Sequence, residues 1–97
     1  MKYRASLSDY AKEDKTEIKN YLSKFYPSTP NQFIAELKKN IENVKDNPYM
    51  YPVYSENPEY RRMIIGNYIA LFKVIEEEKR VDIHRILRAS WNIPAYI

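Results

Sequence analysis

The chain has 97 residues, of which 44% are hydrophobic and 30% are charged, and its formal net charge is +3. This balance excludes a disordered chain and predicts one domain over residues 1–97 with a modest core. The chain has no cysteine, which excludes disulfides, thiolate metal sites and cysteine nucleophiles and fits a reducing cytoplasm. No run is apolar enough for a signal peptide or a membrane span, so we expect a cytoplasmic protein without membrane contact.

The first predicted elements are a strand and a helix. The residues of KYRASLS, 2–8, alternate between apolar and polar, which is typical of a half-buried strand. Ser8 or Asp9 can cap a helix, and apolar residues then recur at helical spacing over 11–25. Asp14 falls inside this apolar stripe, where its simplest interpretation is an acid at the helix edge paired with a nearby base.

A second helix and an aromatic loop follow. Apolar residues from Phe33 to Val44 form a clean stripe, and Asn47-Pro48 ends the helix. The stretch NPYMYPVYSENPEY, residues 47–60, contains three prolines and four tyrosines and is too aromatic for a solvated linker. We therefore expect this loop to lie across the domain with some tyrosines partly buried.

The last predicted elements are three strands joined by short turns. YRRMII and YIALFKVI are β-rich runs separated by Gly66-Asn67, a pair that suits a type II′ turn. IEEEKR forms a charged turn into the strand RVDIHRIL, where alternation fails at Arg85-Ile86 and predicts a bulge. Simple alternation places His84 and Arg88 on one side of this strand.

The element order of strand, helix, helix and three strands predicts an α+β fold. It comprises an N-terminal strand, a helical hairpin and a three-stranded antiparallel meander, with the helices on one face of a single sheet. The other face is left to polar residues or to a partner. Lys73 is expected to project on the sheet beside Arg61 or Arg62, depending on the register.

Positive charge is concentrated in the C-terminal part of the chain. Residues 1–59 carry nine Lys or Arg and nine Asp or Glu, whereas residues 60–97 carry seven and four. A concentrated basic face attracts phosphate backbones or an acidic partner. The same bases are also compatible with ordinary solvated side chains.

Three stretches together resemble the RelE/ParE superfamily of bacterial toxins: YLSKFYPSTPNQFIAEL, NPYMYPVYSENPEYRRMIIGNYIALFKVIEE and VDIHRILRASW. The element order is similar along the whole chain. The resemblance implies the toxin of a type II toxin–antitoxin (plasmid stabilisation) module. Its partner would be a small antitoxin with a segment, expected to be acidic, that wraps this domain.

Within this superfamily, RelE-like toxins cut mRNA in the ribosomal A site. That chemistry needs a base for the ribose 2′-OH, cations for the phosphorane charge and an acid for the leaving oxygen. If the protein is RelE-like, the candidate catalytic residues are Arg61, His84, Arg88 and Tyr96. Met63, Ile69 and Ser90-Trp91, however, stand where the resemblance places basic residues.

ParE-like toxins resemble RelE in fold, and the resemblance implies that they act on DNA gyrase by protein contact and stall it on cleaved DNA. We favour this growth-inhibiting role over the mRNA interferase, so the protein is an endoribonuclease only if it is RelE-like. The expected contacts with the target or antitoxin are Arg61, Arg62, Lys73, Arg85, Arg88 and Trp91.

A third alternative is an inactive or non-toxic binding module. One His and no Cys leave only scattered carboxylates, so we expect no metal site, and a single Gly cannot build a glycine-rich phosphate loop. We therefore expect no cofactor.

Overall fold

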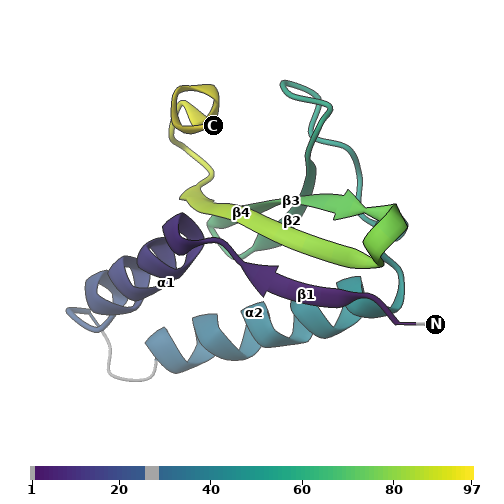
Figure 1. Ribbon diagram of the computed structural model, residues 1–97. Helices are drawn as coiled ribbons and strands as arrows, with labels where there is room; N and C mark the ends of the chain where they lie inside the picture. The colour runs from purple at the N-terminus through teal and green to yellow at the C-terminus, as the bar shows by residue number, and fades with distance from the viewer. Residues whose placement is uncertain (1, 26–28) are drawn as a thin grey trace.

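The computed structural model describes residues 2–25 and 29–97, in which two helices pack on one face of a four-stranded sheet (Figure 1). The expected α+β fold is thereby confirmed. Within the described ranges, neither helix has the combined length and apolarity of a membrane span. The elements in chain order are β1 (Arg4–Leu7), α1 (Asp9–Leu22), α2 (Thr29–Asp46), β2 (Arg61–Ile65), β3 (Tyr68–Ile75) and β4 (Arg80–Arg88), with short 3-10 turns at Pro48–Met50, Glu76–Glu78 and Ile93–Tyr96.

The strand order is β1-β4-β3-β2, with β1 parallel to β4 and the other pairs antiparallel. β1 stops where Leu7 pairs with Ile83, but β4 continues to Arg88. The start of α1 covers this exposed edge of β4. The N–H of Ser8 donates to the Ile83 carbonyl at 2.9 Å, and the Asp14 carboxylate accepts the Ile86 N–H at 3.0 Å. Two residues outside the sheet thus replace the missing strand.

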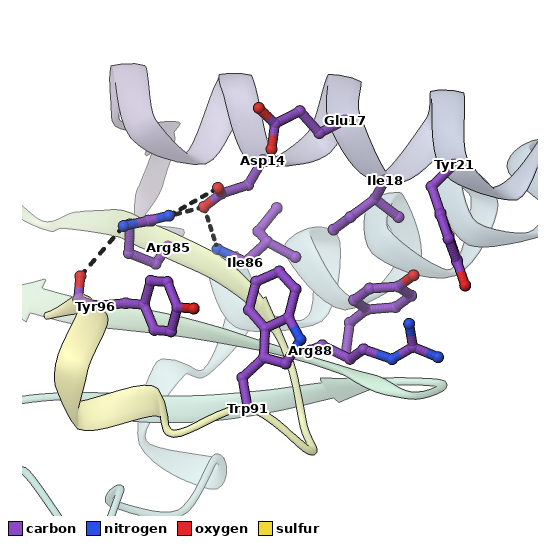
Figure 2. A pocket seen from close by; sticks show the side chains of 10 residues that line it. Asp14, Glu17, Ile18, Tyr21, Arg85, Ile86, Arg88, Trp91 and Tyr96 are labelled. Carbon is purple, nitrogen blue, oxygen red and sulfur yellow. Dashed lines mark hydrogen bonds and ion pairs between the residues drawn. The ribbon is translucent and has the colours of Figure 1, made fainter.

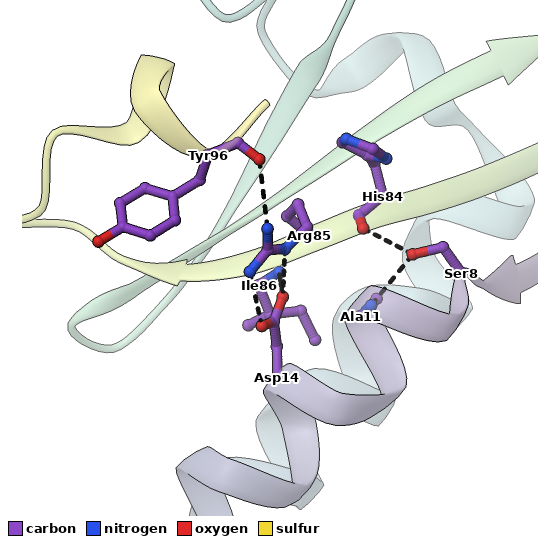
Figure 3. Close-up of polar contacts among 7 residues, drawn as sticks. All are labelled: Ser8, Ala11, Asp14, His84, Arg85, Ile86 and Tyr96. Carbon is purple, nitrogen blue, oxygen red and sulfur yellow. Dashed lines mark hydrogen bonds and ion pairs between the residues drawn. The ribbon is translucent and has the colours of Figure 1, made fainter.

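Of the two residues that the sequence offers as a cap, Ser8 is the N-cap of α1. Its hydroxyl accepts the N–H of Ala11 at 3.0 Å and donates to the carbonyl of His84 at 2.6 Å. The cap is therefore also a tie between the helix and β4 (Figure 3). A capping serine of this kind stabilises a helix by about 1 kcal/mol.

Apolar side chains fill both faces of the sheet. The larger cluster lies between the helices and the sheet and includes Leu37, Met63 and Phe72. A smaller cluster on the far face is built from Tyr54, Tyr60, Leu71, Leu87 and Ile93. Figure 1 shows why: the 51–60 loop and the segment after β4 both rise on the side away from the helices. The far face is thus partly covered by the chain itself.

The turn between β2 and β3 has the backbone that its two residues predict. Gly66 has a φ of 59°, whereas the φ of Asn67 is not positive, as in a type II′ rather than a type I′ turn. Ile65 and Tyr68 pair directly on either side of it. A short two-residue turn therefore sets the register of the hairpin.

The bulge in β4 lies one residue earlier than predicted. Leu71 pairs with Arg85 and Phe72 pairs with Ile83, so His84 is the extra residue. The inserted residue reverses the alternation beyond it. His84 faces the far side of the sheet, whereas Arg88 lies on the helix side, and the expectation that they share a side is wrong.

The register also corrects the expected neighbour of Lys73. Arg61 pairs with Phe72 and Arg62 with Leu71, so the position opposite Lys73 belongs to Tyr60. The Lys73 ammonium lies over the Tyr60 ring, 4.8 Å from its centroid. The residue directly opposite Lys73 is therefore aromatic, and of the two expected neighbours Arg62, not Arg61, shares its face, as a diagonal neighbour.

Candidate functional site

A pocket of about 350 Å³ lies between α1, the end of β4 and the C-terminal segment that follows it (Figure 2). One face of α1 forms its upper wall, because residues three and four apart on a helix point the same way. We call it the α1–tail pocket. Its lining residues are Asp14, Glu17, Ile18, Tyr21, Tyr68, Arg85, Ile86, Arg88, Trp91 and Tyr96.

A nearly buried ion pair frames this pocket. Asp14 is only 8% exposed, and its carboxylate accepts two hydrogen bonds from the Arg85 guanidinium at 2.8 and 2.9 Å. A third bond comes from the N–H of Ile86, so the buried acid is well compensated. Hydrogen bonding to Asp14 raises the pKa of Arg85. The predicted pairing of Asp14 with a base is thus confirmed, with a partner on a distant strand.

Arg85 also holds the C-terminal segment. Its guanidinium donates to the carbonyl of Tyr96 at 3.2 Å (Figure 3) and makes cation–π contacts with the rings of Tyr10 and Tyr96, 5.5 and 5.8 Å from their centroids. Such cation–π contacts each contribute about 0.5–1 kcal/mol at exposed sites. The Arg85 side chain is fully engaged within the protein, so we assign it a structural role at the pocket.

Arg88 is placed differently. Its guanidinium lies over the Tyr21 ring, 5.6 Å from the centroid, and among the described residues no carboxylate forms an ion pair with it. Glu17 lines the same pocket but points away from Arg88 in Figure 2. The pocket therefore offers a cation that forms no ion pair with any acid in the described part of the chain.

The aromatic walls of the pocket remain accessible. Trp91 and Tyr96 stack with ring centroids 5.4 Å apart and are 49% and 44% exposed, and Tyr21 is 40% exposed. Trp, Tyr and Arg are the residue types that contribute most to binding energy at protein interfaces. The arrangement can bind an apolar group with an anion beside it.

Arg61 binds the loop between α2 and β2. Its guanidinium donates to the carbonyl of Tyr51 at 2.7 Å and lies 5.0 Å from the centroid of the Tyr49 ring. Both partners belong to the aromatic loop, which Arg61 thereby fastens to the start of β2. The loop lies across the domain as expected: Tyr51 is half-buried and Tyr54 is buried.

The far face carries a second hollow, also of about 350 Å³. The His84 and Tyr60 rings stack there at 5.1 Å, and the Lys73 ammonium lies 3.3 Å from the Glu59 carboxylate. Burial lowers the pKa of His84, and the charges of Arg85 and Lys73 lower it further. We call this the Tyr60–His84 hollow; its lining residues are Ser6, Leu7, Ser8, Tyr60, Lys73, Asp82, Ile83 and His84.

The structure brings together only some of the predicted site residues. Arg85, Arg88, Trp91 and Tyr96 meet in the α1–tail pocket. Lys73 and His84 lie in the Tyr60–His84 hollow, Arg62 is beside Leu71 on the same far face, and Arg61 is under the loop. The four candidate catalytic residues, Arg61, His84, Arg88 and Tyr96, are thus divided among three places.

Sequence reasoning did not assign Tyr21 to the site and did not identify Arg85 as the partner of Asp14. The acid inside an apolar helical stripe was the one signal, because a buried carboxylate requires a buried base. Among the described residues, no group of three His, Cys, Asp or Glu side chains is arranged to hold a metal ion.

The family model for the ParE toxin of type II toxin–antitoxin systems, parDE, matches residues 5–92. The chain belongs to the ParE toxin family. The match runs from β1 through Arg88 and Trp91 and identifies the chain as the toxin component of such a system. Among curated proteins, no sequence matches this ParE-family chain.

Solved structures similar to this ParE-family toxin share its fold. The chromosomal ParDE system from P. aeruginosa matches with a TM-score of 0.77 and 17% identity, covering 91% of this chain and 97% of that one. The RelBE2 complex from Mycobacterium tuberculosis matches with a TM-score of 0.68 and 16% identity, covering 91% of this chain and 99% of that one. A mutant of the E. coli toxin RelE in the free state matches with a TM-score of 0.69 and 15% identity, covering 99% of this chain and 93% of that one.

Proposed function

We propose that this ParE-family toxin inhibits growth by binding DNA gyrase through protein contact, and that a cognate antitoxin neutralises it. The observation that carries the proposal is the separation of the candidate catalytic residues. Ribonucleolytic cleavage needs a base, cations and an acid around one phosphate. Arg61 is engaged by the loop and His84 lies on the far face, away from Arg88 and Tyr96.

The α1–tail pocket supports a contact role. It combines Trp91, Tyr96 and Arg88 in a concave site whose shape the Asp14–Arg85 pair holds in place. A preformed pocket lined by such residues loses little conformational entropy when a partner fills it. We assign Arg88 and Trp91 as the central gyrase contacts.

A RelE-like endoribonuclease is the second candidate, and the Tyr60–His84 hollow is the observation that favours it. The lowered pKa of His84 favours the neutral imidazole, which is the form that a general base requires. Lys73 lies over the Tyr60 ring on which His84 stacks. However, Lys73 is already paired with Glu59, and Asp82 with Arg80. Among the described residues that line the hollow, no Lys or Arg without an acid partner is left for the phosphorane charge.

Mapping of transcript 5′ ends shortly after induction, with antitoxin withheld, separates the two candidates. The proposal predicts growth arrest without new ends inside translated messages. New ends at defined codon positions would instead establish a ribosome-dependent nuclease. A Trp91→Ala variant is expected to relieve the arrest, whereas a His84→Gln variant is expected to leave it unchanged.

A further inference from the structure

Two hollows lie on either side of Tyr68. The α1–tail pocket is one of them, and a second of about 200 Å³ lies beside the β2–β3 turn, where Leu22, Phe33 and Ile65 line it. Tyr68 lines both hollows, and the consecutive residues Tyr21 and Leu22 line one each. We call the second hollow the hairpin pocket. The two hollows are therefore neighbours on one surface.

Arg88 lies at the boundary between them. It is paired directly with Tyr68 across β3 and β4, so the two side chains are adjacent on the helix side of the sheet. Its guanidinium lies over Tyr21, at the rim of the α1–tail pocket. A ligand that entered both hollows would cross Arg88 on the way.

The surrounding charges favour a carboxylate at this point and disfavour one at the hairpin pocket. Asp14 and Arg85 neutralise each other, and Glu17 points away from Arg88. At the other end, Glu36 lines the hairpin pocket, where it would repel a second acid. The preferred ligand thus has one acid, placed between two apolar groups.

Exposed aromatic rings extend this surface. Phe25 is exposed and packs edge-on against Tyr21 at 5.1 Å, while Trp91 and Tyr96 border the opposite side. Large exposed rings around a concave apolar site mark an interaction surface rather than ordinary solvated surface. Two small hollows separated by a ridge suit the successive side chains of one linear segment.

We propose that the two hollows that flank Tyr68 bind one linear segment of the antitoxin. The segment places an apolar side chain in each hollow and a carboxylate on Arg88. This inference rests on the proposed function only in taking an antitoxin as the neutralising partner. Because the α1–tail pocket is also the proposed gyrase contact, a bound segment would exclude gyrase by covering Trp91.

Trp91 provides a direct readout, because it is the single tryptophan of the chain and lies in the pocket wall. The probe is the toxin-binding fragment of the antitoxin, isolated by limited proteolysis of the co-expressed complex and titrated onto the purified toxin. We expect a blue shift of Trp91 emission on binding. Arg88→Gln should weaken binding at least tenfold, since the segment's carboxylate then lacks its cation.

Arg4→Gln is the matched control. Ala5 and Leu7 of β1 pack on the helix side, so the exposed Arg4 lies on the far face, and no described carboxylate forms an ion pair with it. We expect less than a twofold change in affinity. Equal losses in the two variants, or a larger loss in Arg4→Gln, would overturn the proposal, because binding would then follow net charge or the far face.

A double-mutant cycle identifies the carboxylate. Each Asp and Glu of the fragment is replaced by its amide and tested against both wild-type toxin and Arg88→Gln. One replacement should weaken binding to wild-type toxin and have little further effect on the variant. If every replacement acts equally on both, no carboxylate meets Arg88 and the proposal is wrong.

The circular dichroism spectrum and thermal midpoint of each variant establish that it is folded. Should Arg88→Gln fail to fold, Arg88→Lys keeps the charge, and its predicted smaller loss of affinity is tested instead. No gyrase is present in these titrations. Tight, Arg88-dependent binding by a toxin that leaves gyrase unaffected would therefore contradict the proposed function alone.

Discussion

The α1–tail pocket and the Tyr60–His84 hollow have the same volume, about 350 Å³, but they leave different groups for a partner. In the hollow, Lys73 pairs with Glu59, and the Ser6 hydroxyl donates to Asp82 at 3.3 Å. In the pocket, Arg88 keeps its charge unneutralised by any described acid. Both Lys73 and Arg88 project from the sheet, but only Arg88 has no acid partner among the described residues. Whether a basic residue is available to a partner therefore depends on the acids around it and not on its place in the sheet.

The difference arises from where the acids lie. Glu59 lies just before β2 and is adjacent to the far face, and Asp82 shares a sheet face with its partner Arg80. Two acids line the pocket: Asp14 is bonded to Arg85 and to the edge of β4, and Glu17 points away from Arg88 in Figure 2. Arg88 therefore has no ion-pair partner among the described residues.

The largest expected effect is a loss of stability when the Asp14–Arg85 ion pair at the pocket is removed. Asp14→Ala leaves Arg85 buried without its partner and the Ile86 N–H without an acceptor, so the free energy of unfolding should fall by about 3–5 kcal/mol. Urea denaturation measures this. Glu13→Ala, at an exposed position on the same helix, is the control. A loss below about 1 kcal/mol for Asp14→Ala would mean that the ion pair does not hold the pocket.

The second effect concerns function. Trp91→Ala should weaken gyrase inhibition by about 30-fold, or about 2 kcal/mol, because it removes the largest aromatic surface of the pocket. Lys73→Ala, in the equally large hollow, should change it less than about twofold. Half-inhibitory concentrations in a supercoiling assay give both numbers. The reverse order of effects would assign target contact to the far face.

A smaller effect on stability is expected when Lys73 loses its ion pair in the Tyr60–His84 hollow. Glu59→Gln leaves Lys73 without its acid, but both side chains are substantially exposed. Exposed ion pairs contribute less than about 1 kcal/mol, so thermal stability should barely change. If the variant gains affinity for the antitoxin fragment, an available charge in either hollow is enough for recognition, and the shape of the α1–tail pocket does not decide it.

The smallest effect is a pH dependence from His84. Burial, Arg85 and Lys73 lower its pKa in the folded state, and Asp14 opposes them only in part. The folded protein therefore binds fewer protons than the unfolded chain between the lowered pKa and about 6.5. This histidine contributes stability above about pH 6.5 that declines as the pH falls towards its folded pKa. NMR titration of the single histidine measures this pKa, and a value at or above 6.5 would refute the argument.

Local features of the fold were predictable from the sequence. Ser8 caps α1 and Gly66-Asn67 turns the hairpin because each depends on a few neighbouring residues. The element order and the placement of helices on one sheet face were predictable for the same reason.

Features that depend on distant pairing were not predictable. The bulge at His84 arises where β4 leaves β1 and meets α1, so its position depends on elements far apart in the chain. Asp14 is 71 residues from Arg85, and the sequence indicated only that such an acid needs a base. The covering of the far face by Tyr54 and Ile93 depends on how two irregular segments fold back over the sheet.

The most direct test of a contact toxin is a supercoiling assay with purified gyrase, relaxed plasmid and this protein. We expect wild-type protein to inhibit supercoiling and increase cleaved DNA, Trp91→Ala to do so far less, and His84→Gln to act like wild type. Full supercoiling at an excess of wild-type protein would contradict a gyrase-contact role for this toxin, as would inhibition that depends on His84 and not on Trp91.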